Sequence, residues 1–181
     1  MRTSNRTRIL EAATRVVQRE GVKSLTFDSV ATEAGLTKGG LLYHFASREE
    51  LVLAIHRHLA DEWEGAMVAA AGKPVAECTP GERLAAYARV STQAATRAEL
   101  LFMLEGSTTA EHAATWDGVM ARWTPPAATA TEDPAALDRF IARLAADGLW
   151  LYGALTETPL DPALRHAVAE RIAATLAGYD A

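Results

Sequence analysis

The segment from Thr37 to Phe45 combines residue types that are suited to contact with a polyanion. Lys38 offers a cation to a phosphate or a base edge, while Tyr43 and His44 offer further hydrogen-bond donors. Between them, the Gly39-Gly40 pair weakens a helix by about 1 kcal/mol per residue relative to alanine. The cost is compensated if the helix N-terminus contacts DNA, because a backbone without side chains can approach bases and phosphates closely. The segment therefore predicts a nucleic-acid contact.

Two residues outside this segment extend the prediction. Thr26 and Arg48 stand at predicted helix starts on either side, where backbone N–H groups and a side-chain donor can hold flanking phosphates. The candidate DNA-binding residues are Thr26, Thr37, Lys38, Gly39, Gly40, Tyr43, His44 and Arg48.

A helix, a tight turn and a short second helix position these residues. Thr26 is expected to cap a helix that ends at Gly35, and Thr37 to cap a helix over 38–44 that ends before a buried Phe45. This spacing is typical of a DNA-binding helix-turn-helix. Corners of this kind also occur in ordinary helical bundles, so the glycines and donors, more than the spacing, favour DNA.

The charge of the N-terminal part differs in sign from that of the rest of the chain. Residues 1–58 hold nine Lys/Arg against six Asp/Glu, and the remainder holds nine against seventeen, within a net charge of −5. A mildly basic head on an acidic body suits a DNA reader whose second part is kept away from phosphates. We expect a DNA-binding domain over 1–47 and a second domain over 48–181.

Apolar residues recur at helical spacing throughout, so the chain is predicted to be all-α. Capping residues and breakers delimit nine helices, at about 5–20, 27–34, 38–44, 48–70, 80–95, 99–105, 109–123, 134–155 and 162–178. The fourth is expected to connect the head to the body.

The head resembles a known family. Leu25-Thr26-Phe27, the run from Ala34 to Phe45, and Ser47-Arg48-Glu49-Glu50-Leu51 are similar to the signature of TetR-type regulators. The resemblance implies that the helix over 38–44 reads the major groove, and that the variable C-terminal part binds a small effector and dimerises. Leu42 departs from the commonest pattern, in which a phosphate-binding tyrosine stands at this position. We expect Tyr43 and His44 to carry more of that contact and Leu42 to pack.

The last two predicted helices each have a strongly apolar face. Packing against the same pair from a second chain would give a four-helix interface with two-fold symmetry, although an intramolecular core is the alternative. The candidate interface residues are Leu144, Leu151, Leu155, Leu164, Val168 and Ile172.

Large, adaptable apolar residues surrounded by alanines suit a pocket for an apolar or amphipathic effector, although each of them could instead fill the core. The candidate ligand-binding residues are Trp63, Met67, Phe102, Met103, Trp116, Met120, Trp123 and Trp150, with Glu105, His112 and Asp147 as polar anchors.

Catalytic and metal chemistry find little support in the sequence. The five histidines form no i, i+4 pair, no phosphate loop or nucleophile elbow is present, and Cys78 is the single cysteine. We therefore expect no catalytic residue, no metal and no cofactor. Without a signal peptide or a membrane-spanning run, the chain is expected to be cytoplasmic.

The resulting hypothesis is a homodimeric repressor that leaves its double-stranded operator when it binds a small molecule. Two alternatives stay open. One is a ligand-sequestering helical protein without operator binding, and the other is a ligand-dependent activator or co-repressor-type regulator.

Overall fold

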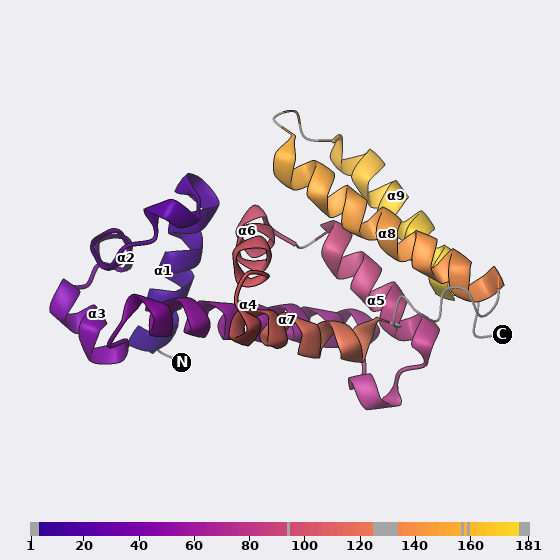
Figure 1. Cartoon of the computed structure of the whole chain (residues 1–181). Coiled ribbons are helices and arrows are strands. Elements are labelled where there is room, and N and C mark those ends of the chain that lie inside the picture. The colour runs from indigo at the N-terminus through magenta and orange to yellow at the C-terminus, as the bar shows by residue number, and fades with distance from the viewer. Residues whose placement is uncertain (1–3, 94, 125–133, 157, 159, 178–181) are drawn as a thin grey trace. The chain divides into compact units, whose positions relative to one another are not determined.

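The computed structural model describes residues 4–93, 95–124, 134–156, 158 and 160–177. Within these residues the chain forms nine α-helices, two short 3-10 helices and no strand (Figure 1), so the predicted all-α class is confirmed. The elements are α1 Asn5–Glu20, η1 Val22–Ser24, α2 Phe27–Ala34, α3 Lys38–His44, α4 Arg48–Ala71, η2 Val75–Glu77, α5 Pro80–Gln93, α6 Arg97–Gly106, α7 Ala110–Trp123, α8 Pro134–Leu155 and α9 Pro162–Ala177.

Side-chain caps fix most helix starts where the sequence predicts them. The Thr26 hydroxyl accepts from the Ser29 N–H at 3.1 Å, and the Ser29 hydroxyl accepts from the Thr26 N–H at 3.0 Å. Thr79 and Glu82 form the predicted capping box of α5, and the Asp161 carboxylate accepts from the backbone of α9. These bonds satisfy backbone donors that a helix N-terminus otherwise leaves unpaired.

The chain divides into two compact units that do not follow chain order. One consists of Met1–Asp61 and Arg97–Trp116, and the other of Glu62–Thr96 and Asp117–Ala181. Helices α4 and α7 therefore each contribute residues to both units. The domain boundary expected between residues 47 and 48 stays a prediction.

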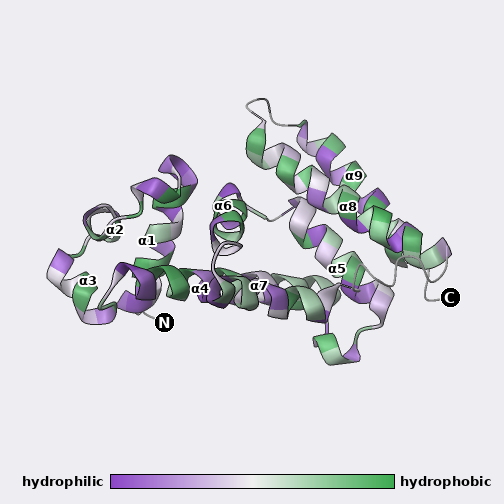
Figure 2. Cartoon of the chain, in the orientation of Figure 1, coloured by the Kyte–Doolittle hydropathy of each residue, from purple (hydrophilic) through white to green (hydrophobic). Residues whose placement is uncertain are grey.

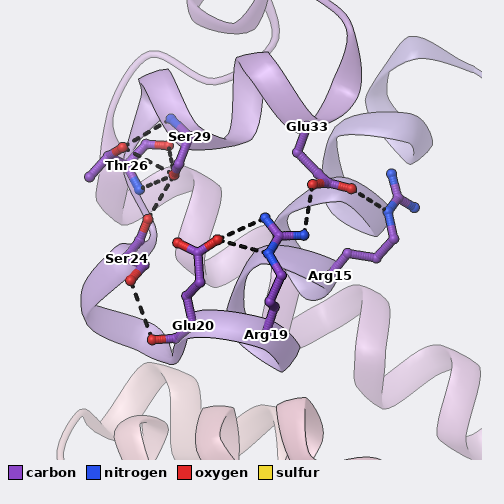
Figure 3. A network of polar contacts seen from close by, with 7 residues as sticks. All are labelled: Arg15, Arg19, Glu20, Ser24, Thr26, Ser29 and Glu33. Atoms are coloured by element: carbon purple, nitrogen blue, oxygen red, sulfur yellow. Dashed lines mark hydrogen bonds and ion pairs between the residues drawn. The ribbon is translucent and has the colours of Figure 1, made fainter.

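The first unit has a dense apolar core. Ile9, Val17 and Leu41 are completely buried, and Phe45 is buried as predicted, with the Arg6 guanidinium 4.5 Å from its ring centroid. Polar bonds on the surface fix α1 against α2 (Figure 3). Arg15 and Arg19 both donate to Glu33, and these bonds hold the pKa of the Glu33 carboxyl below its usual value. The glutamate therefore stays ionised and joins the two helices.

The second unit is built around α5, which packs on both α8 and α9. Small residues of α8 and α9 face this core, so the helices can approach closely; Ala146, Ala169 and Ala173 are completely buried. Hydrogen bonds add to the packing: Trp150 donates to the Thr96 carbonyl at 3.0 Å, and Arg165 to the Thr92 carbonyl at 2.7 Å.

The structure differs from the sequence prediction at a few helix ends. Helix α6 begins at Arg97, two residues early, because Gln18 of α1 accepts a hydrogen bond from the Ala98 N–H and so caps it from a distance. The two 3-10 helices are not among the elements that the sequence predicts. None of the helices in the described ranges combines the length and the hydropathy that crossing a bilayer requires.

Candidate nucleic-acid interface

The turn between α2 and α3 depends on one glycine and one threonine. Gly35 adopts the left-handed conformation, with φ 64° and ψ 38°, and its N–H closes the end of α2. Thr37 then caps α3, because its hydroxyl accepts from the Gly40 N–H at 3.1 Å. Both roles are the ones expected from the sequence. The corner is therefore specified locally and holds α3 in a fixed orientation to α2.

Helix α3 presents its candidate DNA-binding side chains to solvent. Tyr43 is 87% exposed, which is unusual for a tyrosine, whereas Leu41 on the opposite side of the helix is fully buried. Thr37, Lys38 and Gly39 are also exposed, and His44 is half-buried with its ring edge-on to Tyr43 at 5.2 Å. The candidates thus lie on one accessible surface and are not part of the core.

Neither glycine of α3 is required by its backbone conformation. Gly39 and Gly40 have no positive φ, and a Cβ at Gly39 would meet only the Thr37 hydroxyl at 4.0 Å. A Cβ at Gly40 would lie closer, 3.3 Å from the same oxygen. Packing therefore accounts for Gly40 in part and does not account for Gly39.

Three of the candidate DNA-binding residues, Lys38, Arg48 and Thr26, already make bonds within the first unit. Lys38 forms an ion pair with Asp28 of α2 at 2.9 Å, and both side chains are more than half exposed. Arg48 is exposed at the start of α4, and its Nε donates to the Leu25 carbonyl at 3.3 Å. Thr26 is exposed and forms the cap of α2. Asp28 could not be found from the sequence, because a partner ten residues away on another helix is visible only in the fold.

Leu42 requires a correction. The sequence predicts that it packs, but it is 44% exposed, because α3 turns Leu41 and Phe45 inward and leaves Leu42 beside Tyr43 on the surface. The apolar side chain therefore stands on the accessible surface of α3.

Two family models match the chain. The model for bacterial regulatory proteins of the tetR family matches residues 9–55, which include α2 and α3. The model for the tetracyclin repressor-like C-terminal domain matches residues 81–177, more than half of the chain. The chain belongs to the TetR family.

Individual relatives of this TetR-family chain agree with the assignment. The chain is 33% identical over 94 residues to the HTH-type transcriptional regulator BetI of Rhizobium meliloti, an alignment that covers 52% of the chain and 45% of BetI. It is 39% identical over 62 residues to the regulator TtgR of Pseudomonas putida, covering 30% of each protein. The chain thus spans less than half of the length of these curated relatives.

A solved structure extends the similarity over almost the full chain. A TetR-family member from Streptomyces coelicolor A3 is 28% identical, with a TM-score of 0.59 and coverage of 94% of this chain and 98% of the other. The multidrug binding protein EbrR, complexed with malachite green, is 27% identical with the same TM-score and the same coverage.

The predicted ligand-binding residues fall into two groups in this TetR-family chain. Phe102, Met103 and Trp116 lie in the first unit, whereas Trp63, Met67, Met120, Trp123 and Trp150 lie in the second. In the second unit the Trp63 ring lies 5.5 Å from the Tyr87 ring and 5.7 Å from the Trp150 ring. Six of the eight residues are buried, and the two methionines Met103 and Met120 are half-buried.

A buried acid accompanies this aromatic group. The Tyr87 hydroxyl donates to Asp147, and burial raises the pKa of both groups above their usual values. Asp147, one of the predicted polar anchors, is thus already bonded within the unit.

The predicted interface residues are mostly exposed on one chain. Leu144, Leu151, Leu155 and Leu164 are between 43% and 69% exposed, and Val168 is half-buried. Ile172 differs, because it is only 9% exposed and its surface is mostly covered within the protomer. Figure 2 shows hydrophobic residues recurring along α8.

Two predicted polar anchors, Glu105 of α6 and His112 of α7, lie together with the predicted ligand-binding residue Trp116 and with His56 of α4, the one member of this cluster that the sequence analysis did not single out. His56 Nε2 lies 3.1 Å from a Glu105 oxygen, and Trp116 donates to His56 Nδ1 at 2.9 Å. Burial lowers the pKa of His56, which favours the neutral ring. Spacing along one helix could not reveal a cluster whose members come from three helices.

Proposed function

We propose that this TetR-family chain is a DNA-binding transcriptional regulator, a repressor that leaves its operator when it binds a small apolar or amphipathic molecule. The proposal assigns it no catalytic role and places it in the cytoplasm. The observation that carries it is the exposed surface of α3, where Lys38, Gly39 and Tyr43 have no part in the core but stand on a rigid corner. The names of the relatives support the same function.

The proposed contacts differ in kind. Lys38 and the bare backbone at Gly39 would face base edges, which specify sequence. Thr26, Tyr43, His44 and Arg48 would face phosphates, which fix orientation. A repressor of this kind is expected to lose affinity as salt rises, because each phosphate contact made by a cationic side chain such as Arg48 releases bound counterions.

The α8 and α9 surface supports a homodimer. Along α8, Leu137, Ile141, Leu144, Leu151 and Leu155 follow each other at helical spacing and are all more than two-fifths exposed. A contiguous apolar stripe of this kind is rarely left in water. We propose that a second copy covers it with two-fold symmetry, which would place two α3 helices in successive major grooves about 34 Å apart.

The small-molecule effector is the least defined part of the proposal. The aromatic group of Trp63, Tyr87 and Trp150 in the second unit offers rings suited to an apolar or aromatic ligand. EbrR, a multidrug binding protein, forms a complex with malachite green, a bulky aromatic molecule, which supports an effector of similar character here.

The test is binding to DNA from the region upstream of the chain's own gene, measured by fluorescence anisotropy at several salt concentrations. We expect Lys38→Ala and Tyr43→Ala each to weaken binding by about 10-fold or more, and Tyr43→Ala to leave the salt slope nearly unchanged, because its uncharged hydroxyl releases no counterion. Lys23→Ala, which removes an exposed lysine of η1, is the matched control and should change little.

Three outcomes decide between the hypotheses. Salt-dependent binding that is lost in the Lys38 and Tyr43 variants supports operator recognition through α3. Absence of salt-dependent DNA binding in the unmodified protein would instead favour a ligand-sequestering protein. Binding that strengthens when effector is added would make the chain a co-repressor-dependent regulator or an activator.

A further inference from the structure

The first unit contains a cavity beside the beginning of α4. It has a volume of about 520 Å³, within the range of small-molecule sites. Its walls come from the first turns of α4 and from the corner between α6 and α7, and they include Arg48, Leu53, Glu105, Thr109, Glu111 and His112. All of these residues belong to one compact unit. The aromatic group around Trp63 belongs to the other unit.

Glu105 places a carboxylate in the wall of this cavity without a permanent cation to balance it. Its side chain is 32% exposed, and among the described residues its ion-pair partners are two histidines, His56 and His112, with no lysine or arginine. One oxygen accepts from His56, and the other accepts no hydrogen bond from the described part of the chain. Because the side chain is only partly exposed, water compensates its charge less fully than on an open surface, and a cation that reached it would gain a charge-assisted hydrogen bond.

The neighbouring histidines leave this charge largely uncompensated. Trp116 can only donate, so His56 Nδ1 must accept, and the proton of the neutral ring is on Nε2. His56 therefore donates a neutral hydrogen bond to Glu105. His112 Nδ1 lies 3.7 Å from the same oxygen, too far for a hydrogen bond, and it makes no other within the described ranges.

The same geometry argues against a metal ion, although the ligand atoms of His56, Glu105 and His112 lie within 4.8 Å of one another. A metal at His56 Nε2 would need the lone pair of an atom that carries the proton. The two imidazole rings also stack, with centroids 4.5 Å apart and planes 27° apart. Nearly parallel rings do not direct their lone pairs at one ion.

Gly106 holds His56 in this arrangement. A Cβ at Gly106 would lie 2.8 Å from His56 Cε1 and 3.2 Å from the His112 Cβ, so only glycine lets the ring fit here. His56 and Trp116 are therefore positioning residues, which fix one oxygen of Glu105 and leave the other available.

We propose that this cavity binds a small organic cation, an amidinium or ammonium compound, with Glu105 as its carboxylate anchor. The lining also holds Glu49, Glu50 and Glu111 against one arginine, Arg48, and Arg57 pairs with Glu111 at 3.5 Å, so acidic groups still outnumber basic ones around the cavity and favour a cation. A planar amidinium can donate to the available Glu105 oxygen in a charge-assisted hydrogen bond.

The position of the cavity links it to regulation, an inference that rests on the proposed DNA-binding function. Arg48, a proposed phosphate contact, lines the cavity, as does Glu50, whose carboxylate caps α4 by accepting from the Ala46 N–H at 2.8 Å. A bound cation would compete for this carboxylate and disturb the start of α4. We expect the ligand to lower DNA affinity, and DNA to lower ligand affinity by the same factor.

The test uses benzamidinium and its neutral isostere benzamide as probes, in isothermal titration calorimetry with the full chain. We expect one benzamidinium per protomer, bound at least about 10-fold more tightly than benzamide. Glu105→Gln should remove this preference, because the amide still accepts from His56 but carries no charge. Glu11→Gln, an exposed glutamate of α1, is the matched control and should bind normally.

A second variant guards against an effect on folding. Leu53→Trp would fill the cavity without changing charge, and it should block benzamidinium while the melting temperature stays near that of the parent. Equal binding of benzamide and benzamidinium, or unchanged binding by Glu105→Gln, would overturn the proposal. So would tight binding of Zn²⁺ alone that disappears in both Glu105→Gln and His112→Ala, because the cluster would then be a metal site.

A parallel measurement of DNA binding, with and without benzamidinium, distinguishes failure of this proposal from failure of the proposed function. If benzamidinium binds through Glu105 and weakens DNA binding in the parent but not in Glu105→Gln, both proposals are supported. If it binds through Glu105 while no salt-dependent DNA binding exists, the cation site stands and the regulator function fails. If DNA binding is present but saturating benzamidinium leaves it unchanged, the regulatory link is wrong.

Discussion

Lys38 holds an intramolecular contact that it would have to give up in order to bind DNA. Its ion pair with Asp28 is exposed, so it contributes little to stability, but Asp28 also places a negative charge beside the proposed contact surface. We predict that Asp28→Asn raises DNA affinity by about 2- to 10-fold at about 50 mM salt, and by less at higher salt. Fluorescence anisotropy at matched salt concentrations measures the change.

A double-mutant cycle distinguishes the two ways in which Asp28 can act. If Asp28 acts by holding Lys38, its removal should have almost no effect in a Lys38→Ala background. A gain of the same size in both backgrounds would show that Asp28 repels phosphates directly and that the ion pair does not restrain Lys38. A loss of affinity in Asp28→Asn would contradict both mechanisms.

Helix α3 gives up intrinsic stability at Gly39 for no visible structural reason. A Cβ there would meet nothing closer than 4.0 Å, and the backbone has an ordinary negative φ. We predict that Gly39→Ala stabilises the protein against denaturant by up to about 1 kcal/mol and weakens DNA binding by about 10-fold or more. Chemical denaturation and anisotropy, performed on the same preparation, measure the two effects.

Gly65 of α4 is a matched control for the opposite changes in stability and DNA affinity that we predict for Gly39→Ala. It also lies inside a helix with open space at its Cβ position, so Gly65→Ala should give a similar stabilisation without affecting DNA binding. Weakened DNA binding in Gly65→Ala would mean that the effect at Gly39 is not local to α3. An unchanged affinity in Gly39→Ala would mean that the backbone of α3 does not approach the DNA there.

The sequence predicted elements well where the determining contacts are local. Thr26, Thr37 and Thr79 cap helices through bonds that reach three residues along the chain, and such pairs are visible in the sequence. Contacts between distant segments were not predictable, because spacing within one element says nothing about them. The early start of α6, capped by Gln18, and the bond between His56 and Glu105 both depend on this tertiary packing.

The eight predicted ligand-binding residues also show that the sequence does not reveal contacts between distant segments. Their apolar character predicted burial, and six of them are buried. Their types could not reveal that Trp116 bonds to His56 in one unit while Trp63 meets Trp150 in the other. Assigning residues to one cavity requires the fold.

At the scale of the whole molecule, one chain leaves four leucines of α8, Leu137, Leu144, Leu151 and Leu155, exposed. Alanines such as Ala142 and Ala146 face the core, whereas Leu144 and Leu151 face solvent. A helix of a monomeric protein normally has the opposite arrangement, with large residues buried and small or polar ones outside. The arrangement is consistent with a surface whose core is completed by a second copy of the chain.

This reasoning makes the oligomeric state a test of the regulator proposal. Leu151→Asp places a charge in the stripe at a site that is 43% exposed within one chain, so the protomer should still fold while the dimer dissociates. A monomer binds half-sites singly and loses the effective concentration that a second tethered reader provides, so DNA affinity should fall by about 10²-fold or more. Light scattering after gel filtration measures the mass, and anisotropy the affinity.

Leu104→Asp, at a 59% exposed leucine of α6 outside the stripe, should leave both unchanged. A Leu151→Asp protein that remains dimeric would place the interface elsewhere, and one that is monomeric but binds operator DNA as tightly as the parent would show that dimerisation does not contribute to recognition.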